Sequence, residues 1–496
     1  MSSSQEALKQ LDESPLSGFH FKTVITAGMG FLTDAYDLFI IGVVTSILKD
    51  TWHITSLETS LLSSVALLAS VLGAVVFGRI ADTMGRKFIY GYELLVLAIG
   101  AIASALAPNV IWLLIFRFIL GVGIGGDYPV SSTLMSEYAN RKDRGKLITF
   151  VFSTQALGLI IGPLLTYILL QSGIDKELTW RLILGAGAIP ALATFWLRRQ
   201  ISETPRFALA KGDDAGVTRA VEMAEGKHSN AAEAGDKSEN LVPEQTRQDQ
   251  ETSTQEKNES VQERKTSWRE LFTVRHWLIW LLGAAGTWFL LDIAYYGTTV
   301  STPIVIKLFS PKTSLTTNML YTLLIFVVAA LPGYILSAFT VDRIGRKPIQ
   351  LVGFGMMAVS YGVLFIFPQL TAITIPFLLC YGLAYLFTEF GPNVTTFLYP
   401  AEIFPVTVRT TAHGIAAGLG KFGAFIGAFI FPLMLASANF KLPGAMGVAA
   451  IICLAGFLLT FVLPEPKQKS LETIEKEGEE LDQKIEVREN QQGSPA

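Results

Sequence analysis

An acidic residue, Asp292, interrupts an otherwise apolar stretch of the chain that runs roughly from 276 to 300. This stretch is long enough to span a bilayer, which takes about 20 residues in a helix. Trp288, Asp292 and Tyr296 are spaced i, i+4 and i+8, so a helix places them on one face. Because a charged side chain at membrane depth is costly and by default marks a functional site, we predict that this face forms the wall of a solute site.

A buried cation is predicted at Lys421, which lies in the apolar stretch 418–427, too deep for its amine to extend readily to the membrane surface. Its charge can offset that of an anionic solute. A salt bridge to Asp292 in the empty protein is the structural alternative, and it is compatible with transport. A carboxylate repels an anion, so Asp292 must be protonated or must accept a hydrogen bond from a protonated anion. Either arrangement links proton occupancy to anion occupancy.

A second acidic group is predicted in the first apolar stretch, where Asp34 and Asp37 lie three residues apart. Acids inside membrane segments usually mark ion or proton paths, so we predict a proton role; a structural pair neutralised by Arg117 is the alternative. Asp127 follows a glycine pair and precedes Tyr128-Pro129. It either takes part in proton coupling or satisfies backbone groups where the helix is interrupted.

The composition indicates the elements that position these residues. Half of the 496 residues are hydrophobic and only 16% are charged, whereas a soluble protein carries roughly 25% charged residues. The chain is therefore predicted to be an all-α polytopic membrane protein with twelve transmembrane helices in two six-helix halves. The expected helices lie at approximately 22–48, 57–78, 88–107, 110–136, 146–171, 179–198, 275–301, 316–340, 348–368, 372–398, 411–437 and 443–463.

The domain organisation follows from where polar segments interrupt this pattern. Residues 205–270 are rich in Glu, Gln, Asn, Ser and Lys, which predicts a disordered linker. Lys and Arg concentrate between the second and third helices and between the eighth and ninth, which places those loops, the linker and both termini in the cytoplasm. The predicted parts are a cytoplasmic tail at 1–21, six-helix halves at 22–204 and 271–465, the linker, and a cytoplasmic tail at 466–496.

The two halves repeat one another in their charged loops. The motif Asp82-Thr-Met-Gly85-Arg86-Lys87 recurs as Asp342-Arg-Ile-Gly345-Arg346-Lys347. Parallel repeats of this kind place the substrate site at their interface. We predict a structural and gating role, not substrate binding, for the charged residues at the cytoplasmic helix ends: Asp82, Arg86, Glu137, Arg144, Asp342, Arg346, Glu402 and Arg409.

Several motifs resemble those of the major facilitator superfamily. They are the loop motif Gly78-Arg-Ile-Ala-Asp82-Thr-Met-Gly85-Arg86-Lys87, the fourth-helix motif Arg117-Phe-Ile-Leu-Gly121-Val-Gly123-Ile-Gly125-Gly126, and the helix-end motifs Ser202-Glu203-Thr204-Pro205-Arg206 and Pro464-Glu465-Pro466 of sugar-porter relatives. Two longer segments are similar to the phosphate:proton symporter family: Gly125-Gly126-Asp127-Tyr128-Pro129 with its continuation to Ser136-Glu137, and Trp288-Phe-Leu-Leu-Asp292-Ile-Ala-Tyr-Tyr296-Gly297.

The resemblance implies a proton-coupled symporter that imports inorganic phosphate by alternating access, in the plasma membrane. It implies phosphate ligands at Tyr128, Gln155, Trp288, Asp292, Tyr296 and Asn393, with Lys421 as the cation, and proton coupling by Asp34, Asp37, Arg117 and Asp127. The expected partners are phosphate, protons and the lipid bilayer, and no nucleic acid.

Two other functions stay open at this stage. One is a proton-coupled transporter of a sugar or organic anion on the same fold, although a neutral sugar site needs neither a buried lysine nor its acid partner. The other is a phosphate-sensing transceptor that uses the long linker. No enzyme, metal site or cofactor is expected, because the five histidines lack ligand spacing and no phosphate-binding loop of the ATPase type occurs.

Overall fold

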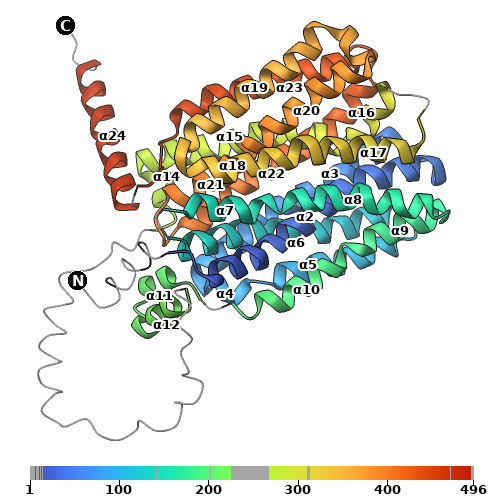
Figure 1. Cartoon of the computed structure of the whole chain (residues 1–496). Coiled ribbons are helices and arrows are strands. Elements are labelled where there is room, and N and C mark those ends of the chain that lie inside the picture. The colour runs from blue at the N-terminus through green and yellow to red at the C-terminus, as the bar shows by residue number, and fades with distance from the viewer. Residues whose placement is uncertain are drawn as a thin grey trace, which may run out of the picture.

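The computed structural model describes residues 15–140, 142–201, 203–224, 267–309, 313–469 and 471–492, together with Glu6, Leu11 and Glu13. Its described part is helical and contains no strand (Figure 1). Twelve helical runs in this part are long and apolar enough to cross a membrane, as the sequence predicted. Ser202 and residues 225–266 of the predicted linker lie outside the described residues.

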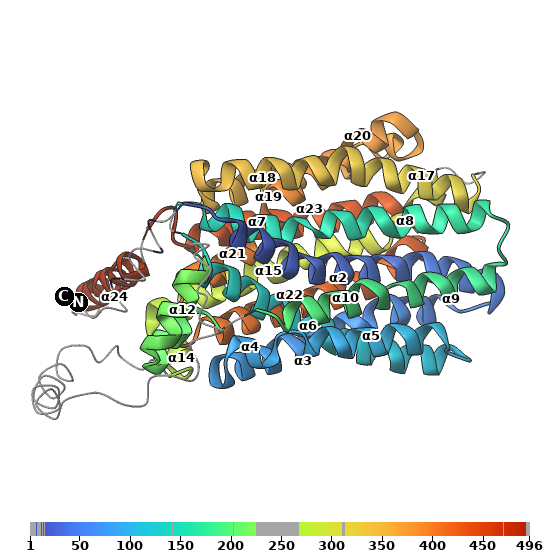
Figure 2. The same cartoon turned by 60° about the horizontal axis from the view of Figure 1, so that its bottom comes forward.

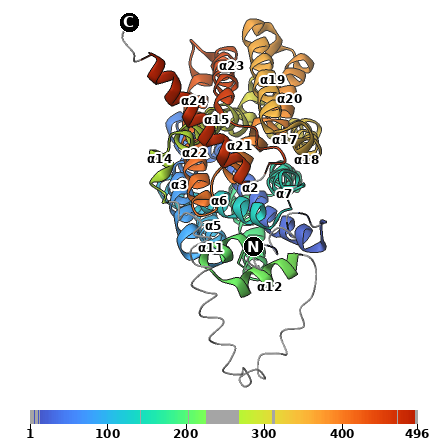
Figure 3. The same cartoon turned by 90° about the vertical axis from the view of Figure 1, so that its left-hand side faces the viewer.

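The first six runs form one bundle and the second six form another beside it, blue to green and yellow to red in Figures 1 and 3. The first bundle contains α2 (Gly18–Thr51), α3 (Ser56–Met84), α4 (Arg86–Ile89) with α5 (Tyr92–Ala105), α6 (Val110–Tyr138), α7 (Arg144–Ser153) with α8 (Gln155–Gln171), and α9 (Lys176–Ala186) with α10 (Ala188–Arg198). The second contains α15 (Arg275–Val300), α17 (Leu315–Ile325) with η1 (Phe326–Ala330) and α18 (Leu331–Ile344), α19 (Arg346–Ile366), α20 (Thr374–Phe390) with α21 (Pro392–Ile403), α22 (Arg409–Ala436), and α23 (Lys441–Leu459) with η3 (Thr460–Val462).

Short helices lie outside the twelve runs. They are α11 (Pro205–Lys211), α12 (Asp214–Ala224), α14 (Glu270–Thr273), α16 (Thr302–Phe309), η2 (Pro368–Ala372) and the longer α24 (Leu471–Gln492). Four of them, α11, α12, α14 and α24, gather where α2 begins, at what we call the tail end of the bundle (Figures 1 and 2). The other end of the bundle is called the opposite end.

The first part of the predicted disordered linker is helical in the structure, in α11 and α12. The reason is a short amphipathic pattern within the polar composition: Val217, Ala220, Val221 and Ala224 share one face of α12 and are buried. The Ser17 hydroxyl also donates to the Ala224 carbonyl at 2.5 Å, which joins this segment to the start of α2. The overall composition of a polar segment does not reveal an apolar face made of only four residues.

Small residues let the two bundles approach closely where α3 meets α22. A Cβ atom added at Gly414 would lie 2.5 Å from the Ala74 carbonyl oxygen, and one at Gly78 would lie 2.9 Å from that of Thr410. Such distances are shorter than van der Waals contact, so these positions admit no side chain without moving a helix. Close packing through small residues is typical of membrane helix interfaces.

Breaks in two membrane-crossing runs position polar residues between the bundles. The α20–α21 run breaks at Gly391, where Pro392 supplies no backbone N–H, and Asn393 follows directly. The α7–α8 run breaks at Thr154, whose hydroxyl donates to the Gly28 carbonyl at 2.5 Å, and Gln155 begins α8. Interrupted helices are tolerated at membrane depth where neighbouring protein groups satisfy the freed backbone.

Candidate functional site

The Lys421 ammonium forms the centre of a polar group between the two bundles. From α22 it donates a 2.8 Å hydrogen bond to the Tyr296 hydroxyl and lies 3.4 Å from an Asp292 carboxylate oxygen, both on α15. It also lies 4.2 Å from the ring centroid of Tyr128, which belongs to α6 in the other bundle. An ammonium over an aromatic face is attracted by the ring quadrupole. Residues of both halves therefore hold this buried cation.

Trp288 completes an aromatic wall one turn before Asp292 on α15. Its ring centroid lies 6.1 Å from that of Tyr128, 6.2 Å from that of Phe397 and 5.5 Å from that of His413. The approach of α22 is close here, because a Cβ at Gly420 would lie 2.6 Å from the Trp288 ring. The spacing Trp288–Asp292–Tyr296 thus brings the three side chains to one region, as the sequence indicated.

A line of hydrogen bonds runs from this centre to the broken α20–α21 run. The Gln155 amide donates to the Tyr128 hydroxyl at 3.5 Å, and the Tyr128 and Tyr296 hydroxyls are also 3.5 Å apart. The Tyr334 hydroxyl of α18 donates to Gln155 at 3.3 Å and accepts from the Asn393 amide at 2.9 Å. The structure therefore connects all the predicted phosphate ligands and Lys421 into one group, although their roles stay predictions.

Tyr334 is a member of this group that the sequence analysis missed. It belongs to no motif, and a tyrosine in an apolar stretch is usually a packing residue. The only available signal was its hydroxyl, which needs a partner once it is buried.

The group is closed off from both ends in this structure. Each predicted phosphate ligand and Lys421 is at most 6% exposed. A cavity of only about 10 Å³ adjoins Gln155 and Tyr296, between α2 and α8 of one bundle and α15 of the other. A solute therefore reaches the group only when the bundles separate at one end.

The predicted proton-coupling acids lie on the α2 side of the first bundle. Both carboxylate oxygens of Asp34 and of Asp37 are buried, and among the described residues they have no hydrogen-bond partner. Arg117, the neutralising partner in the alternative given above, donates at 3.0 Å to the Asp37 backbone carbonyl and not to either carboxylate. The Arg117 charge still acts on the Asp37 carboxyl, so both the proton role and the neutralised pair stay open.

Asp127 has an ion-pair partner that the sequence analysis missed. Arg198, the last residue of α10, contacts both Asp127 oxygens at 2.6 and 2.9 Å and the Glu93 carboxylate at 2.7 Å. All three side chains are fully buried. An arginine at the end of an apolar stretch is more often a flanking charge at the membrane surface, so its position gave no sign of this role.

Asp34 is close enough to this ion pair and to Lys421 to interact with both electrostatically. Gly30, one turn before Asp34 on α2, lies so close to the pair that an added Cβ would overlap Asp127 and Arg198. Asp34 interacts electrostatically with Asp127, Arg198, Asp37 and Lys421. A charge change at Asp34 is therefore felt both by the buried ion pair and by the cation of the polar group.

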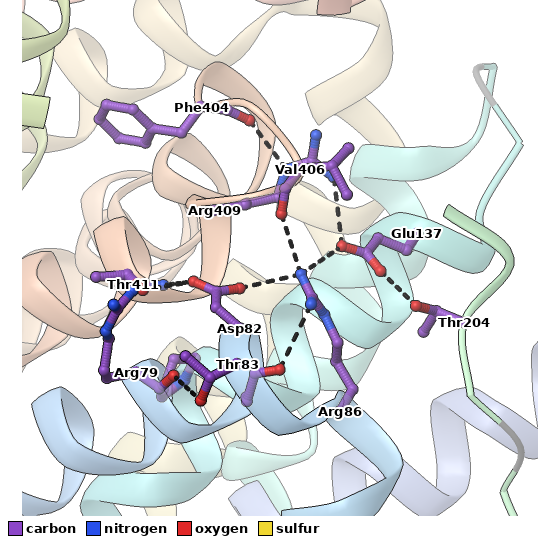
Figure 4. A network of polar contacts seen from close by, with 12 residues as sticks. Arg79, Asp82, Thr83, Arg86, Glu137, Thr204, Phe404, Val406, Arg409 and Thr411 are labelled. Atoms are coloured by element: carbon purple, nitrogen blue, oxygen red, sulfur yellow. Dashed lines mark hydrogen bonds and ion pairs between the residues drawn. The ribbon is translucent and has the colours of Figure 1, made fainter. Parts of the chain in front are cut away.

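The predicted gating residues form networks at the tail end. Arg86 lies 3.1 Å from Asp82 and 3.0 Å from Glu137, and it donates at 3.1 Å to the Val406 carbonyl of the other half (Figure 4). Asp82 accepts at 2.5 Å from the Thr411 backbone N–H, which also belongs to the other half. These bonds fasten the halves together at this end.

The second half contains a copy of this network. Arg346 lies 2.8 Å from Asp342 and 2.6 Å from Glu402, and Asp342 accepts at 2.7 Å from the Lys146 backbone N–H of the first half. Arg409 lies 3.9 Å from Glu137.

Three more residues belong to the tail-end networks: Glu203 and Glu465 of the helix-end motifs, and the predicted gating residue Arg144. Glu203 accepts from the backbone N–H of Arg86 at 3.2 Å, and Glu465 accepts from that of Arg346 at 3.1 Å. Burial raises the pKa of the Glu203 carboxyl. Arg144 is buried and interacts electrostatically with Arg409.

Comparisons with known proteins agree on one type of molecule. Residues 22–477 match the family described as "Sugar (and other) transporter". The chain is 34% identical to "Probable inorganic phosphate transporter 1-6" of Arabidopsis thaliana, covering 97% of this chain and 98% of the relative. It is also 34% identical to "Repressible high-affinity phosphate permease" of Neurospora crassa. That match covers 94% of this chain and 88% of the relative. A solved structure with a similar fold is that of the major facilitator superfamily proton:xylose symporter XylE bound to 6-bromo-6-deoxy-D-glucose. It superposes with a TM-score of 0.76 at 21% identity, and the match covers 93% of this chain and 99% of the XylE chain.

Proposed function

Because this chain belongs to the sugar (and other) transporter family of the major facilitator superfamily, we propose that it imports inorganic phosphate together with protons by alternating access. The single observation that carries the proposal is the buried Lys421 ammonium, held between the halves by Tyr296, Asp292 and Tyr128. An isolated buried charge is very costly unless it is paired. Once Asp292 is protonated, a neutral sugar would leave Lys421 without a charge partner, whereas phosphate would supply one.

Asp292 and phosphate are proposed to share Lys421 in turn. In this structure Asp292 neutralises the lysine at 3.4 Å. Protonation of Asp292 removes this negative charge and leaves Lys421 free to pair with the anion. The Tyr296, Tyr128 and Gln155 side chains and the Asn393 amide then supply hydrogen-bond donors from both halves. Proton loading and phosphate loading therefore favour each other at one site.

The acids of the first bundle are proposed to carry proton coupling to the rest of the cycle. Within the described part of the chain, no hydrogen-bond donor holds the ionised form of Asp34 or Asp37, which suits groups that bind and release protons. Arg117 and the Asp127–Arg198 pair provide the charged surroundings. Each elementary charge that moves through 100 mV releases about 2.3 kcal/mol, so more than one proton per monovalent phosphate makes accumulation favourable inside a negative compartment.

The tail-end networks are proposed to work as the cytoplasmic gate, with both termini in the cytoplasm of a plasma-membrane protein. The positive loop residues support this orientation. Opening the gate breaks the bonds that cross between halves, from Arg86 to Val406, from Thr411 to Asp82 and from Lys146 to Asp342. Rocking of one bundle against the other about the central site exposes that site to each side in turn.

Uptake of radiolabelled phosphate into proteoliposomes tests the proposed function. Purified protein should accumulate phosphate when the outside is made acidic, and a protonophore should abolish the accumulation. Unlabelled xylose or a monocarboxylate should not compete. Accumulation of a sugar or another organic anion in place of phosphate would contradict the proposal, and phosphate binding without any transport would favour a sensor.

Asp34 and Asp37 should be required for accumulation but not for binding. Asp34→Asn and Asp37→Asn remove a proton-binding group and leave Lys421 and its neighbours in place. We expect gradient-driven accumulation to fall at least tenfold, with phosphate affinity and exchange without a gradient changed by less than about threefold. Asp50→Asn is the matched control, because Asp50 is exposed and its ion pair with Lys176 lies on the surface. A parallel fall of binding and uptake would assign these acids to the phosphate site instead.

Substitutions at two closely packed glycines should each hold one end of the bundle open. A Cβ at Gly414 would lie 2.5 Å from the Ala74 carbonyl oxygen, and a Cβ at Gly42 would lie 2.3 Å from that of Val300 near the opposite end. Gly414→Leu should therefore hold the tail end open, and Gly42→Leu should hold the opposite end open. Both variants should bind phosphate and lose transport.

Distances between pairs of spin labels show which end of the bundle is open in each variant. Labels at the exposed residues Met84 and Ile344 report the tail end, and labels at the exposed residues Lys49 and Lys307 report the opposite end. We expect the first distance to increase in Gly414→Leu only and the second in Gly42→Leu only. An increase of neither distance, with both proteins folded, would show that these contacts do not control closure.

A further inference from the structure

A second buried acid lies at the far end of the hydrogen-bond line, in the second half. Glu389 of α20 is fully buried, two residues before the helix break at Gly391. Its side chain accepts a 2.5 Å hydrogen bond from the Asn393 amide. Helix α18 packs so closely that a Cβ at Gly333 would lie 2.9 Å from the Glu389 Cβ atom. Neither the predicted phosphate ligands nor the predicted proton acids include this residue.

The other groups that face Glu389 are phenols. Among the described residues, the phenols that interact with Glu389 are Tyr295 of α15, Tyr334 of α18, Tyr361 of α19 and Tyr385 of α20 itself. Among the groups found to act on the Glu389 carboxyl in the described residues there is no lysine or arginine. A buried carboxylate without a cation is costly, and such acids in membrane helices by default serve function.

Asn393 joins Glu389 to the candidate phosphate site. Its amide nitrogen donates to Glu389 and, at 2.9 Å, to the Tyr334 hydroxyl. From there the line of hydrogen bonds continues without a gap through Gln155, Tyr128 and Tyr296 to Lys421. The protonation state of Glu389 is therefore connected to the cation centre through side chains alone.

The amide of Asn393 can transmit that protonation state because its two ends differ. An amide has two N–H donors on nitrogen and an acceptor on oxygen. In the observed arrangement both N–H groups are used, one by Glu389 and one by Tyr334, so none is left for an anion. A protonated Glu389 can instead donate its own O–H to the amide oxygen, which frees an N–H for the anion.

We propose that Glu389 is a proton-carrying residue of the second half, which sets the orientation of the Asn393 amide and so couples one proton to phosphate binding. This inference rests on the proposed function, since it assigns Asn393 to a phosphate site. Glu389 acts through Asn393 and is a positioning residue. The proton enters the carboxyl when phosphate binds and leaves it when phosphate is released.

The test is the pH dependence of phosphate affinity in purified wild type and Glu389→Gln, measured from pH 5 to pH 9. Glutamine imitates the protonated acid, because its N–H can donate to the Asn393 oxygen. A site coupled to one proton changes its affinity up to tenfold per pH unit. We expect the slope of log Kd against pH to fall by about one in Glu389→Gln, while affinity at acidic pH is kept. The titration of phosphate itself is common to both proteins and cancels.

Controls make each outcome decisive. Tyr385→Phe removes a phenol of the same cluster that hydrogen-bonds Thr299 and Thr302, and it should leave the slope unchanged. Glu389→Asn provides a second neutral variant should the first fail to fold. An unchanged slope in a folded variant would overturn the inference, and so would loss of binding at every pH. Failure of wild type itself to bind phosphate would instead overturn the proposed function.

Discussion

Lys421→Ala should weaken phosphate binding on the order of 100-fold or more, and Lys421→Arg should retain much more of it. Truncating one partner of a buried charge pair costs about 2–5 kcal/mol, and each 1.4 kcal/mol is a factor of about 10 in affinity. Arginine keeps the charge, but its planar fork does not reproduce the geometry of a point ammonium beside the Tyr296 hydroxyl. Isothermal titration of the purified variants with phosphate measures both effects.

The double variant Lys421→Ala/Asp292→Asn separates folding from binding in this experiment. Lys421→Ala alone leaves the Asp292 carboxylate buried without its 3.4 Å partner, which destabilises the protein. The second substitution removes that charge, so thermal stability should recover while phosphate binding should not. Lys441, which is exposed, gives a surface Lys→Ala control. Wild-type affinity in folded Lys421→Ala would make Lys421 a structural residue and remove the main cation of the proposed site.

Asp292→Asn should reduce gradient-driven phosphate accumulation to background while the protein still inserts and folds. Asparagine cannot ionise, so Lys421 has no acid partner after phosphate leaves, and the empty carrier has to return with an unpaired buried charge. Phosphate binding should change by less than about tenfold, because the substitution also removes the repulsion between the carboxylate and the anion.

Uptake and binding are measured on the same purified Asp292→Asn protein. This distinguishes loss of proton coupling, in which phosphate still binds, from loss of the phosphate site. The surface variant Asp50→Asn again provides the control for an Asp→Asn change. Normal proton-driven accumulation by Asp292→Asn would show that this acid does not link the proton to the anion.

The central part of the site could be predicted because its signals are local. One helix carries Trp288, Asp292 and Tyr296 at a spacing that defines a face, and an acid or a lysine within an apolar stretch is unusual enough to be noticed. The twelve apolar stretches likewise follow from hydrophobicity alone. In each case the physical cost of a charge in the membrane, or the length of a bilayer-spanning helix, is visible in a single segment.

The missed residues depend on contacts between distant segments. Arg198 pairs with Asp127 and Glu93 only because α10 packs beside α2 and α5. Tyr334 bridges Gln155 and Asn393, which are 238 positions apart in the chain (393 − 155). Neither contact leaves a pattern in one segment. The bond from Arg117 to the Asp37 backbone carbonyl likewise joins α6 to α2 and leaves no pattern in either segment.

Proton movement driven by a phosphate gradient alone tests most directly whether the Lys421–Asp292 site couples the two substrates. Proteoliposomes start without a proton gradient, contain a pH-sensitive dye and are held at zero voltage by potassium and valinomycin. Addition of external phosphate should acidify the interior with wild type, but not with Asp292→Asn or Lys421→Ala. Entry of labelled phosphate through wild type without any internal acidification beyond that of protein-free vesicles would contradict proton symport at this site.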